Sequence, residues 1–504
     1  MKFIDHFLNS ITMYRLLIYG LGILVIISLI LSWFGLLYFS PLELLVSSLT
    51  LFVVCNLVNL GLAKLYKAPV NIESASITAL ILTLILVPPS TFSDFSVVVA
   101  AGIIAMLSKY VLAIKKKHLF NPAAITLLII GLAGSGMAYW WVSSEPLLPF
   151  VLIIGLLVVR KIRRFAMFGT FILTSFILLA VPGFFENTAI MEIISAIFYS
   201  WPIIFLGTIM LTEPLTTPPT KQLQIMYAVI VGSLVSVQFS FGPLYSTPEL
   251  ALVVGNIFVY AVSSKKKLRL SLLSKQPLSK DIYEFIFKSQ EIVSFKPGQY
   301  FEWTLPKLFL ENRGNRRYFT IASSPTEHDL RLGVRVFAKS SRFKQELVNM
   351  KEGEEMWASQ LTGDFVLPED TQTKLLFIAG GVGVTPFRSM IKYLLDRHEA
   401  RDIVLMYACS SVDSFVYQDI FAEAGKSLGV KVVYIITDKQ NIPKDWQGKT
   451  GFIDAKLLKE TVPDFRERLS YLSGPNSMVE AYEQLLLSVG MTSSSIKKDY
   501  FPGF

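Results

Sequence analysis

Three glycines within four residues are the feature of this 504-residue chain that points most directly to chemistry. Gly380, Gly381 and Gly383 follow the apolar run 375–379, and Thr385 comes soon after them. Glycines at a strand end let the backbone approach a diphosphate, and the first turn of a following helix offers free N–H groups to that anion. The pattern predicts a nucleotide diphosphate site, although a plain strand–helix turn would have the same local sequence.

Two kinds of sheet are predicted to position this turn. Residues 267–368 alternate apolar and polar side chains with period two, and turn residues separate the runs, which is typical of an antiparallel β-barrel. From residue 373 onward, strand patterns alternate with helix patterns, which predicts a doubly wound parallel α/β sheet. The glycine turn lies at the first strand–helix junction of that second sheet.

The barrel segment carries its own candidate residues in the sequence Arg317-Tyr318-Phe319-Thr320. A barrel followed by a parallel sheet, with this segment on the barrel and the glycine turn on the sheet, resembles the ferredoxin–NADP⁺ reductase family over residues 266–504. The resemblance implies an FAD on the barrel, a nicotinamide dinucleotide on the sheet and hydride transfer between them.

The resemblance also implies roles for the residues of the barrel motif. Arg317 would bind the FAD diphosphate through its planar guanidinium, which presents paired donors. Phe319 would pack on the isoalloxazine, and Thr320 would donate a hydrogen bond to flavin N5. Tyr318 belongs to the same FAD-binding motif.

Further FAD contacts are implied at two other places. Ser340 and Ser341 align with the family's second diphosphate-binding segment, although the family's usual glycine is missing there. Phe501 and Phe504, in the last six residues, resemble the aromatic tail that covers the flavin.

The nicotinamide side of the resemblance rests on the glycine turn and on a second loop. Ser473 stands where the family often has a cysteine near the nicotinamide, so that a hydroxyl replaces a thiol. Thr320 and Ser473 are therefore the two expected catalytic residues. The dinucleotide-binding residues that the resemblance implies are Gly380, Gly381, Gly383, Thr385, Gly474 and Pro475.

The choice between NADH and NADPH depends on the segment after Cys409, which reads Ser-Ser-Val-Asp-Ser. A 2′-phosphate normally needs an Arg or Lys there, and this segment has no cation and one acid, Asp413. The sequence therefore favours NADH, while Ser410 and Ser411 leave binding of a phosphate open.

The first half of the chain has a different composition. Hydrophobic residues make up 52% of the whole chain, and charged residues are scarce before residue 263. Apolar runs of spanning length predict ten membrane helices. The predicted spans are 14–39, 42–66, 74–88, 94–113, 120–141, 147–160, 165–183, 190–212, 223–240 and 247–263.

Charge placement predicts the orientation of these helices. The lysines and arginines of the first half cluster in alternate loops, at 64–67, 115–117, 160–164, 221 and 265–267, whereas the intervening loops contain none. Positive loops mark the cytoplasm, so both termini are predicted inside a multi-pass cell membrane. The same clusters account for much of the net charge of +9, so nucleic-acid binding is not expected.

A similar sequence pattern occurs in both halves of this membrane segment. Residues 77–89 and 204–219 both end in paired prolines, and both 120–128 and 251–259 contain an Asn in an apolar run. A spacing of five spans would make these halves an inverted repeat, which tends to place a site near the pseudo-twofold axis. A simpler interpretation is that the prolines only close helices in two loops.

Segments within this repeated pattern also resemble a known membrane family. The sequences 117–124 (Lys-His-Leu-Phe-Asn-Pro-Ala-Ala) and 210–218 (Met-Leu-Thr-Glu-Pro-Leu-Thr-Thr-Pro) resemble the homologous ten-span membrane proteins of the sodium-pumping NADH:quinone reductase and of the Rnf electron-transport complex. The resemblance implies electron transfer through the membrane. Asn121 and Asn256 in the repeated motif, and Glu213 as an ionisable residue beside a helix-breaking proline, are the candidate flavin or quinone residues. Glu213 replaces the family's usual Asp.

One departure bears on the cofactor. The family's flavinylation threonine should lie in the loop 133–149, which contains no threonine. A non-covalent FMN or a quinone is therefore the candidate group of the membrane segment.

The few cysteines and histidines exclude several metal centres within this chain. Its two cysteines, Cys55 and Cys409, cannot form a four-thiolate iron–sulfur cluster, and none of the four histidines makes a pair on an apolar helix that could hold a haem. No metal site is expected. This disfavours a haem-containing ferric reductase or superoxide-producing oxidase.

Together these patterns predict a chain of three domains: a transmembrane electron-transfer domain (1–263), an FAD-binding β-barrel (264–368) and an NAD(P)-binding α/β domain (369–504). The predicted function is a membrane-bound, FAD-dependent NAD(P)H oxidoreductase that passes electrons to a flavin or quinone among the helices. Other electron-transfer proteins are candidate partners. The alternative is a transporter or channel that the flavoreductase module regulates by sensing redox state.

Overall fold

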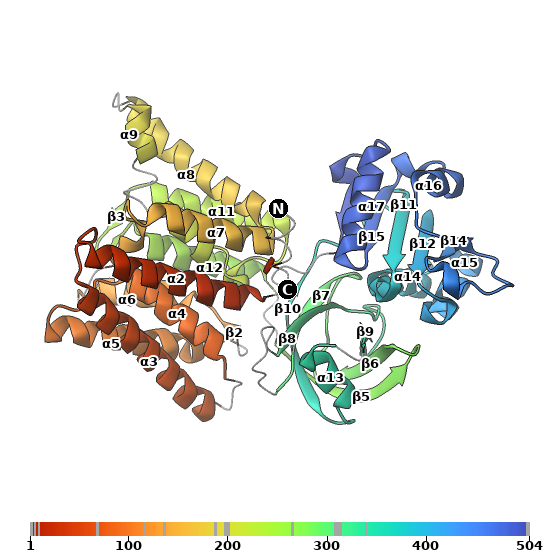
Figure 1. Ribbon diagram of the computed structural model, residues 1–504, viewed down its shortest axis with the longest axis horizontal. Helices are drawn as coiled ribbons and strands as arrows, with labels where there is room; N and C mark the ends of the chain where they lie inside the picture. Colours follow the sequence, from red (N-terminus) through yellow and green to blue (C-terminus); the bar gives the residue numbers. More distant parts are fainter. Residues whose placement is uncertain are drawn as a thin grey trace. The chain divides into compact units, whose positions relative to one another are not determined.

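The computed structural model describes residues 4, 7–8, 11–66, 70–114, 117–134, 138–185, 189–195, 202–263, 267–306, 315–337 and 340–499. These residues form two compact units that divide between Lys267 and Leu268. We call them the helical unit and the two-sheet unit (Figure 1). The predicted boundary at 263/264 lies just before this division.

The helical unit is built from apolar helices joined by short loops and two small hairpins. Most of them start at a polar cap: Ser40 and Glu43, for example, form a capping box at the start of α3. Its helices are α2 (Met13–Trp33), α3 (Pro41–Leu65), α4 (Ile72–Ile85), α5 (Phe92–Val111), α6 (Pro122–Leu132), α7 (Leu148–Ile162), α8 (Phe165–Phe185), α9 (Ile190–Ser195), α10 (Ile203–Phe205), which continues as η3 (Leu206–Met210), α11 (Lys221–Ser236) and α12 (Pro248–Val262). The hairpins pair β1 (Ala113–Ile114) with β2 (Lys117–His118) and β3 (Ser240–Phe241) with β4 (Leu244–Tyr245).

These helices overlap the predicted spans but differ from them in length. Among the described residues, α2, α3, α5 and most of α8 are long and apolar enough to cross a membrane, whereas α4, α6 and α12 are apolar but shorter. The predicted span 120–141 stops at Leu132, because the chain turns at Gly134, whose φ of 64° is left-handed. The count of ten spans stays a prediction.

The two-sheet unit begins with an antiparallel sheet. Within the described residues its six strands lie in the order β8-β7-β10-β5-β6-β9, and every neighbouring pair is antiparallel. Inward-facing aromatic and aliphatic side chains, among them Phe285, Phe301 and Trp303, fill its core. The strands are β5 (Leu268–Pro277), β6 (Ile282–Ser289), β7 (Tyr300–Thr304), β8 (Arg316–Thr320), β9 (Leu330–Arg335) and β10 (Glu355–Thr362), and helix α13 (Arg342–Asn349) lies between the last two.

A parallel sheet follows, with helices between its strands (Figure 1). Its order is β14-β13-β12-β11-β15-β16, and all neighbouring pairs are parallel. Its strands are β11 (Leu375–Gly380), β12 (Ile403–Cys409), β13 (Lys431–Ile436), β14 (Lys449–Thr450), β15 (Leu469–Ser473) and β16 (Ile496–Lys498), and its helices are α14 (Thr385–Asp396), α15 (Gln418–Leu428), α16 (Ala455–Thr461) and α17 (Asn476–Ser488).

The strand order places a switch point beside β11. From β11 the chain builds outward through β12, β13 and β14, and it then returns to place β15 on the other side of β11. Ligands of open α/β sheets bind at the carboxyl ends of strands at such a point. A site is therefore expected at the loops that leave β11 and β15.

Candidate functional site

The two loops at the switch point are in close contact. Ala379 on β11 pairs with Ser473 on β15, so that the glycine turn and the sequence Ser473-Gly474-Pro475 leave the sheet together. A Cβ added to Gly383 would lie 2.6 Å from the backbone N of Gly474 and from the carbonyl O of Ser473. Only glycine therefore fits at Gly383, because the backbones of the two loops pack directly against each other there.

The glycine turn leads directly into a helix, as predicted. Gly381 has a left-handed φ of 54° and starts the short helical turn η5 (Gly381–Val384), after which α14 begins at Thr385. Pro475 stands at the N-cap position of α17. Two helix N-termini thus face the same edge of the sheet, where they favour an anion.

A buried carboxylate joins the two residues predicted to be catalytic. The hydroxyls of Thr320 at the end of β8 and Ser473 at the end of β15 donate hydrogen bonds of 3.2 and 3.0 Å to Oδ2 of Asp499. Thr320 and Ser473 are almost fully buried. Burial raises the pKa of Asp499 to about 6, although the hydrogen bonds from Ser473 and Thr320 lower it. The other oxygen, Oδ1, is buried and has no hydrogen-bond partner among the described residues.

Asp499 was not among the residues predicted from the sequence. It follows β16, the edge strand, and meets Thr320 only because β16 pairs with β15 at the switch point. The only local signal is an acid that directly follows a short strand near the chain end.

The barrel motif divides between two faces of β8. Arg317 and Phe319 are two residues apart and therefore lie on the same face of the strand. The ring of Phe343 on α13 lies 5.3 Å from the Arg317 guanidinium carbon and 5.9 Å from the Phe319 ring. Phe343 thus joins the strand to the segment of Ser340 and Ser341, which directly precedes α13. The structure brings these predicted FAD residues together, and Phe343 is an addition to them.

Tyr318 lies apart from that group. Its ring packs on Tyr300 at 5.5 Å, and its hydroxyl is 3.3 Å from the buried carboxylate of Glu302 and from the side-chain oxygen of Gln360. This polar cluster anchors the strand and is separate from the face that carries Arg317.

A cation that the sequence did not reveal reaches the glycine turn. Arg335, at the end of β9, places Nη1 3.0 Å from the point where a Cβ on Gly381 would lie. Its Nη2 donates to the hydroxyl of Ser414 at 3.2 Å, and its Nε lies 3.0 Å from Asp281. The segment after Cys409, where the sequence would place a nucleotide-binding cation, has none, whereas the antiparallel sheet supplies one.

Hydrogen bonds and an ion pair join the two sheets beside the site. Arg388 on α14 donates to the carbonyl of Ala322 at 3.0 Å and to Glu327, and the hydroxyl of Ser389 donates to the carbonyl of Ser323 at 2.6 Å. Burial opposes ionisation of Glu327, but Arg388 lowers its pKa overall. The helix after the glycine turn is therefore tied to the loop after Thr320.

The helical unit contains a polar cluster of its own. The side chain of Asn121 donates to Glu213 Oε2 at 2.8 Å, and the Asn121 backbone N–H donates to the side-chain oxygen of Asn256 at 2.7 Å. Thr216 also donates to Glu213, and Asn256 donates to the hydroxyl of Tyr227. The three candidate residues Asn121, Glu213 and Asn256 therefore lie together.

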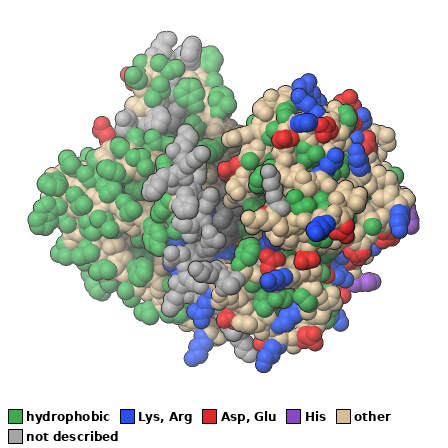
Figure 2. Space-filling view, turned by 45° about the vertical axis from the view of Figure 1, so that its right-hand side comes forward, with side chains coloured by type: hydrophobic (Ala, Val, Ile, Leu, Met, Phe, Trp, Pro, Cys, Tyr) green, Lys and Arg blue, Asp and Glu red, His purple; other side chains and the backbone are tan. Residues whose placement is uncertain are grey.

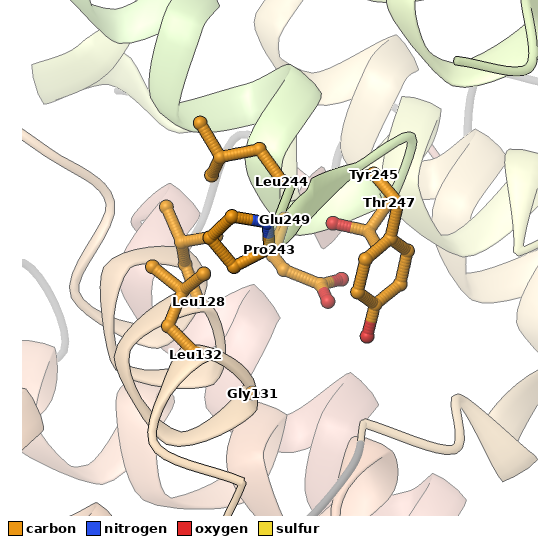
Figure 3. Close-up of a pocket in the computed structure, with 8 residues that line it drawn as sticks. All are labelled: Leu128, Gly131, Leu132, Pro243, Leu244, Tyr245, Thr247 and Glu249. Carbon is orange, nitrogen blue, oxygen red and sulfur yellow. The ribbon is translucent and has the colours of Figure 1, made fainter. Parts of the chain in front are cut away.

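A small cavity of about 10 Å³ lies between the C-terminal end of α6 and the N-terminal end of α12. Glu249 and the hairpin β3–β4 line it (Figure 3). It has room for about one water molecule. The indole N–H of Trp140 donates to Glu249 at 3.3 Å. None of the residues predicted for a site lines this cavity.

Two of the predicted flavin contacts, Phe501 and Phe504, lie outside the described residues. Within the part of the chain that the structure describes, no three His, Cys, Asp or Glu side chains gather to hold a metal ion.

Comparison with known proteins bears on the two-sheet unit. Residues 377–484 match the family model described as "Oxidoreductase NAD-binding domain". The glycine betaine monooxygenase reductase subunit of Pseudomonas aeruginosa is 26% identical over 224 residues, which cover 44% of this chain and 60% of the relative. The flavohemoprotein of Oceanobacillus iheyensis is 26% identical over 239 residues, or 46% of this chain and 58% of the relative. This chain therefore spans less than two thirds of the length of these relatives.

Among solved structures, the Amycolatopsis cytochrome P450 reductase GcoB is similar, with 25% identity and a TM-score of 0.42. The match covers 47% of this chain and 70% of that one.

Proposed function

We propose that this chain takes electrons from NAD(P)H into FAD and passes them to a flavin or quinone in its helical unit, since its C-terminal half is a ferredoxin–NADP⁺ reductase-type FAD/NAD-binding oxidoreductase domain. The observation that carries the proposal is the contact of Thr320 and Ser473 with one buried carboxylate at the switch point. Residues from both sheets meet there, where a flavin on one sheet and a nicotinamide on the other must meet.

The residues present fit both cofactors. The two helix N-termini at the switch point and the guanidinium of Arg335 beside Gly381 suit the diphosphate of a dinucleotide. Arg317, Phe319 and the segment of Ser340 and Ser341 form the candidate FAD surface. When bound, the two cofactors supply hydride transfer, and the protein supplies their binding and orientation.

The chain's own contribution at the reacting centre is to hold and move a proton. Asp499 accepts hydrogen bonds through the single hydroxyl proton of Thr320 and that of Ser473, so in this arrangement each hydroxyl has only acceptor lone pairs left, and the expected donation from Thr320 to flavin N5 would require its O–H to turn away from Asp499. Because its pKa lies near 6, Asp499 can exchange a proton near neutral pH. The tie between Arg388 and Glu327 keeps the two sheets, and hence the two cofactor segments, in fixed register.

The further parts of the proposal concern the helical unit and the choice of nucleotide. The chain would cross the cell membrane ten times with both termini and the two-sheet unit in the cytoplasm, and NADH would be the favoured nucleotide. Long apolar helices and the hydrophobic surface of the helical unit in Figure 2 support a membrane location. The Glu213 carboxylate, whose Oε1 faces His118 while Oε2 accepts hydrogen bonds from Asn121 and Thr216, supports a polar site among the helices.

The test is the rate at which NADH reduces the flavin of the purified full-length protein. Thr320→Val removes the hydroxyl but keeps the shape, so reduction should slow on the order of tenfold or more. Thr371→Val, in an exposed loop, is the matched control and should not change the rate. An equal rate in Thr320→Val and wild type would contradict the assigned site.

The alternative is a transporter or channel regulated by the flavoreductase module. The feature that favours it is the pair of Pro-started segments, α6 after Asn121 and η4 (Pro214–Thr216) after Glu213, which resembles the broken helices of transporters. Flavin reduction by NADH without sustained turnover on a quinone would support this alternative.

A further inference from the structure

The polar cluster of the helical unit uses most of its hydrogen-bonding groups internally. Asn121 Oδ1 caps α6 by accepting from the backbone N–H groups of Ala123 and Ala124, at 3.0 and 3.1 Å. Oε2 of Glu213 accepts from Asn121 and from Thr216, at 2.8 and 3.1 Å. These bonds fix the start of α6 against the segment that begins at Glu213, and they leave little capacity for a ligand.

Two reactive atoms of the cluster are left facing one another. His118 Nε2 lies 3.8 Å from Glu213 Oε1, which is too far for a direct hydrogen bond. His118 Nε2 is buried and has no hydrogen-bond partner among the described residues. The His118 and Glu213 side chains are 12% and 20% exposed, so both remain within reach of water. A small movement of either side chain would bring the two atoms within hydrogen-bond distance.

The charges that surround the pair come from several elements. Lys109 on α5 donates to the backbone and side chain of Ser74 at 2.9 and 3.0 Å, and its charge acts on Glu213. Arg164, which precedes α8, donates to the carbonyl of Thr212, one residue before Glu213. Tyr227 on α11 is also in electrostatic contact with Glu213. Lys109 and Arg164 therefore place positive charge near the Glu213 carboxylate.

The position of the pair in the chain places it on the predicted cytoplasmic side of the helices. His118 ends the hairpin β1–β2, in the lysine-rich loop predicted to be cytoplasmic, and Asn121 starts an apolar helix three residues later. The pair therefore stands where an aqueous loop meets the helices.

We propose that His118 and Glu213 are the proton-entry pair of the helical unit, which delivers protons from the cytoplasmic side to a quinone reduced there. The inference rests on the proposed function. The overall change is NADH + H⁺ + quinone → NAD⁺ + quinol, in which the quinone gains two electrons and two O–H bonds. His118 gives up its proton through Glu213 and regains one from water, so that the residues end unchanged.

The experiment compares two acceptors in the full-length protein. Ferricyanide takes electrons without protons and reports on the two-sheet unit, whereas a short-chain ubiquinone needs the proton path. His118→Gln keeps hydrogen-bonding capacity but cannot carry a proton. We expect quinone reduction to fall on the order of 100-fold above pH 7 and to recover as the pH is lowered, with ferricyanide reduction unchanged. His328→Gln, at an exposed histidine of the two-sheet unit, is the matched control.

A second pair of variants and a spectroscopic readout separate proton transfer from folding. Glu213→Asp should keep quinone reduction within a few-fold of wild type, whereas Glu213→Gln should lose it as His118→Gln does. The infrared difference spectrum between oxidised and NADH-reduced protein should contain histidine and carboxylate bands that disappear in His118→Gln and Glu213→Gln. Unchanged bands and an unchanged pH profile in His118→Gln would overturn the inference while the proposed function stands. Wild-type protein that reduces ferricyanide but no quinone would overturn both.

Discussion

The two units of this chain both contain buried polar clusters, but they use them in different ways. In the two-sheet unit, Thr320, Ser473 and Asp499 come from the ends of three strands, and a carboxylate oxygen remains open at their centre. In the helical unit, Asn121, Asn256 and Glu213 bond mainly to one another and fix the start of a helix. We propose that the first arrangement faces bound cofactors, whereas the second is mainly architectural and, among the described residues, leaves His118 Nε2 without a hydrogen-bond partner.

The surfaces of the two units also differ in the kinds of side chain that they expose. In Figure 2 hydrophobic side chains cover the visible face of the helical unit, whereas Lys, Arg, Asp and Glu are spread over the two-sheet unit. A surface of the first kind suits lipid or protein neighbours, and one of the second kind suits water. The comparison can be sharpened by variants that remove one polar group from each unit.

The largest effect is expected at Asp499, through the pH dependence of stability. Because its pKa is raised from 3.8 to about 6 by burial, the folded protein loses stability as the pH rises through this range, by up to about 3 kcal/mol. Asp499→Asn removes this loss. Urea unfolding of flavin-free protein at pH 4.5 and pH 7.5 should show a smaller decline for the variant than for wild type. Equal declines in the free energy of unfolding would show that burial does not raise the pKa of Asp499.

Arg335 is expected to have the next largest effect, on nucleotide binding. A charge-assisted hydrogen bond to a diphosphate contributes about 2 kcal/mol, so Arg335→Gln should raise the KM for NADH by more than tenfold. Arg269→Gln, which removes an exposed arginine paired with Glu355, is the charge-matched control. Steady-state kinetics with ferricyanide give both values, and an equal KM in the two variants would contradict the role of Arg335.

The smallest effect is expected from Asn121, in the helical unit. Asn121→Ala removes an N-cap and the side-chain hydrogen bond to Glu213, which should lower the free energy of unfolding by about 1–2 kcal/mol. Ser40→Ala, at the exposed cap of α3, is the control for a cap alone. Thermal unfolding in detergent measures both, while NADH reduction of ferricyanide should stay at the wild-type rate. A large loss of that ferricyanide activity would show that Asn121 also affects the activity of the two-sheet unit.

The parts of the site that depend on local pattern could be predicted from the sequence. The glycine turn could be placed because an apolar run, three glycines and a helix start stand next to each other in the chain. Asp499 and Arg335 could not be placed, because each reaches the switch point through strand order: one from the edge strand β16 and the other from the antiparallel sheet. Phe343 was missed for the same reason, since only folding brings α13 against β8.

Helix lengths were predicted less well than helix positions. Hydrophobic runs continue past the point where a backbone turns, so the span predicted to reach residue 141 ends at Leu132 before the left-handed Gly134. In contrast, Asn121, Glu213 and Asn256, which were singled out from separate parts of the sequence, lie together in the structure, where Asn121 bonds to both of the others.

The most direct test of the account is electron transfer through the whole chain. Full-length protein in lipid vesicles, loaded with FAD and mixed with NADH under anaerobic conditions, should bleach the flavin absorbance. A short-chain ubiquinone should then restore the absorbance and sustain turnover. A flavin that NADH does not reduce, or that a quinone does not reoxidise, would contradict the claim that the two-sheet unit feeds electrons into the helices.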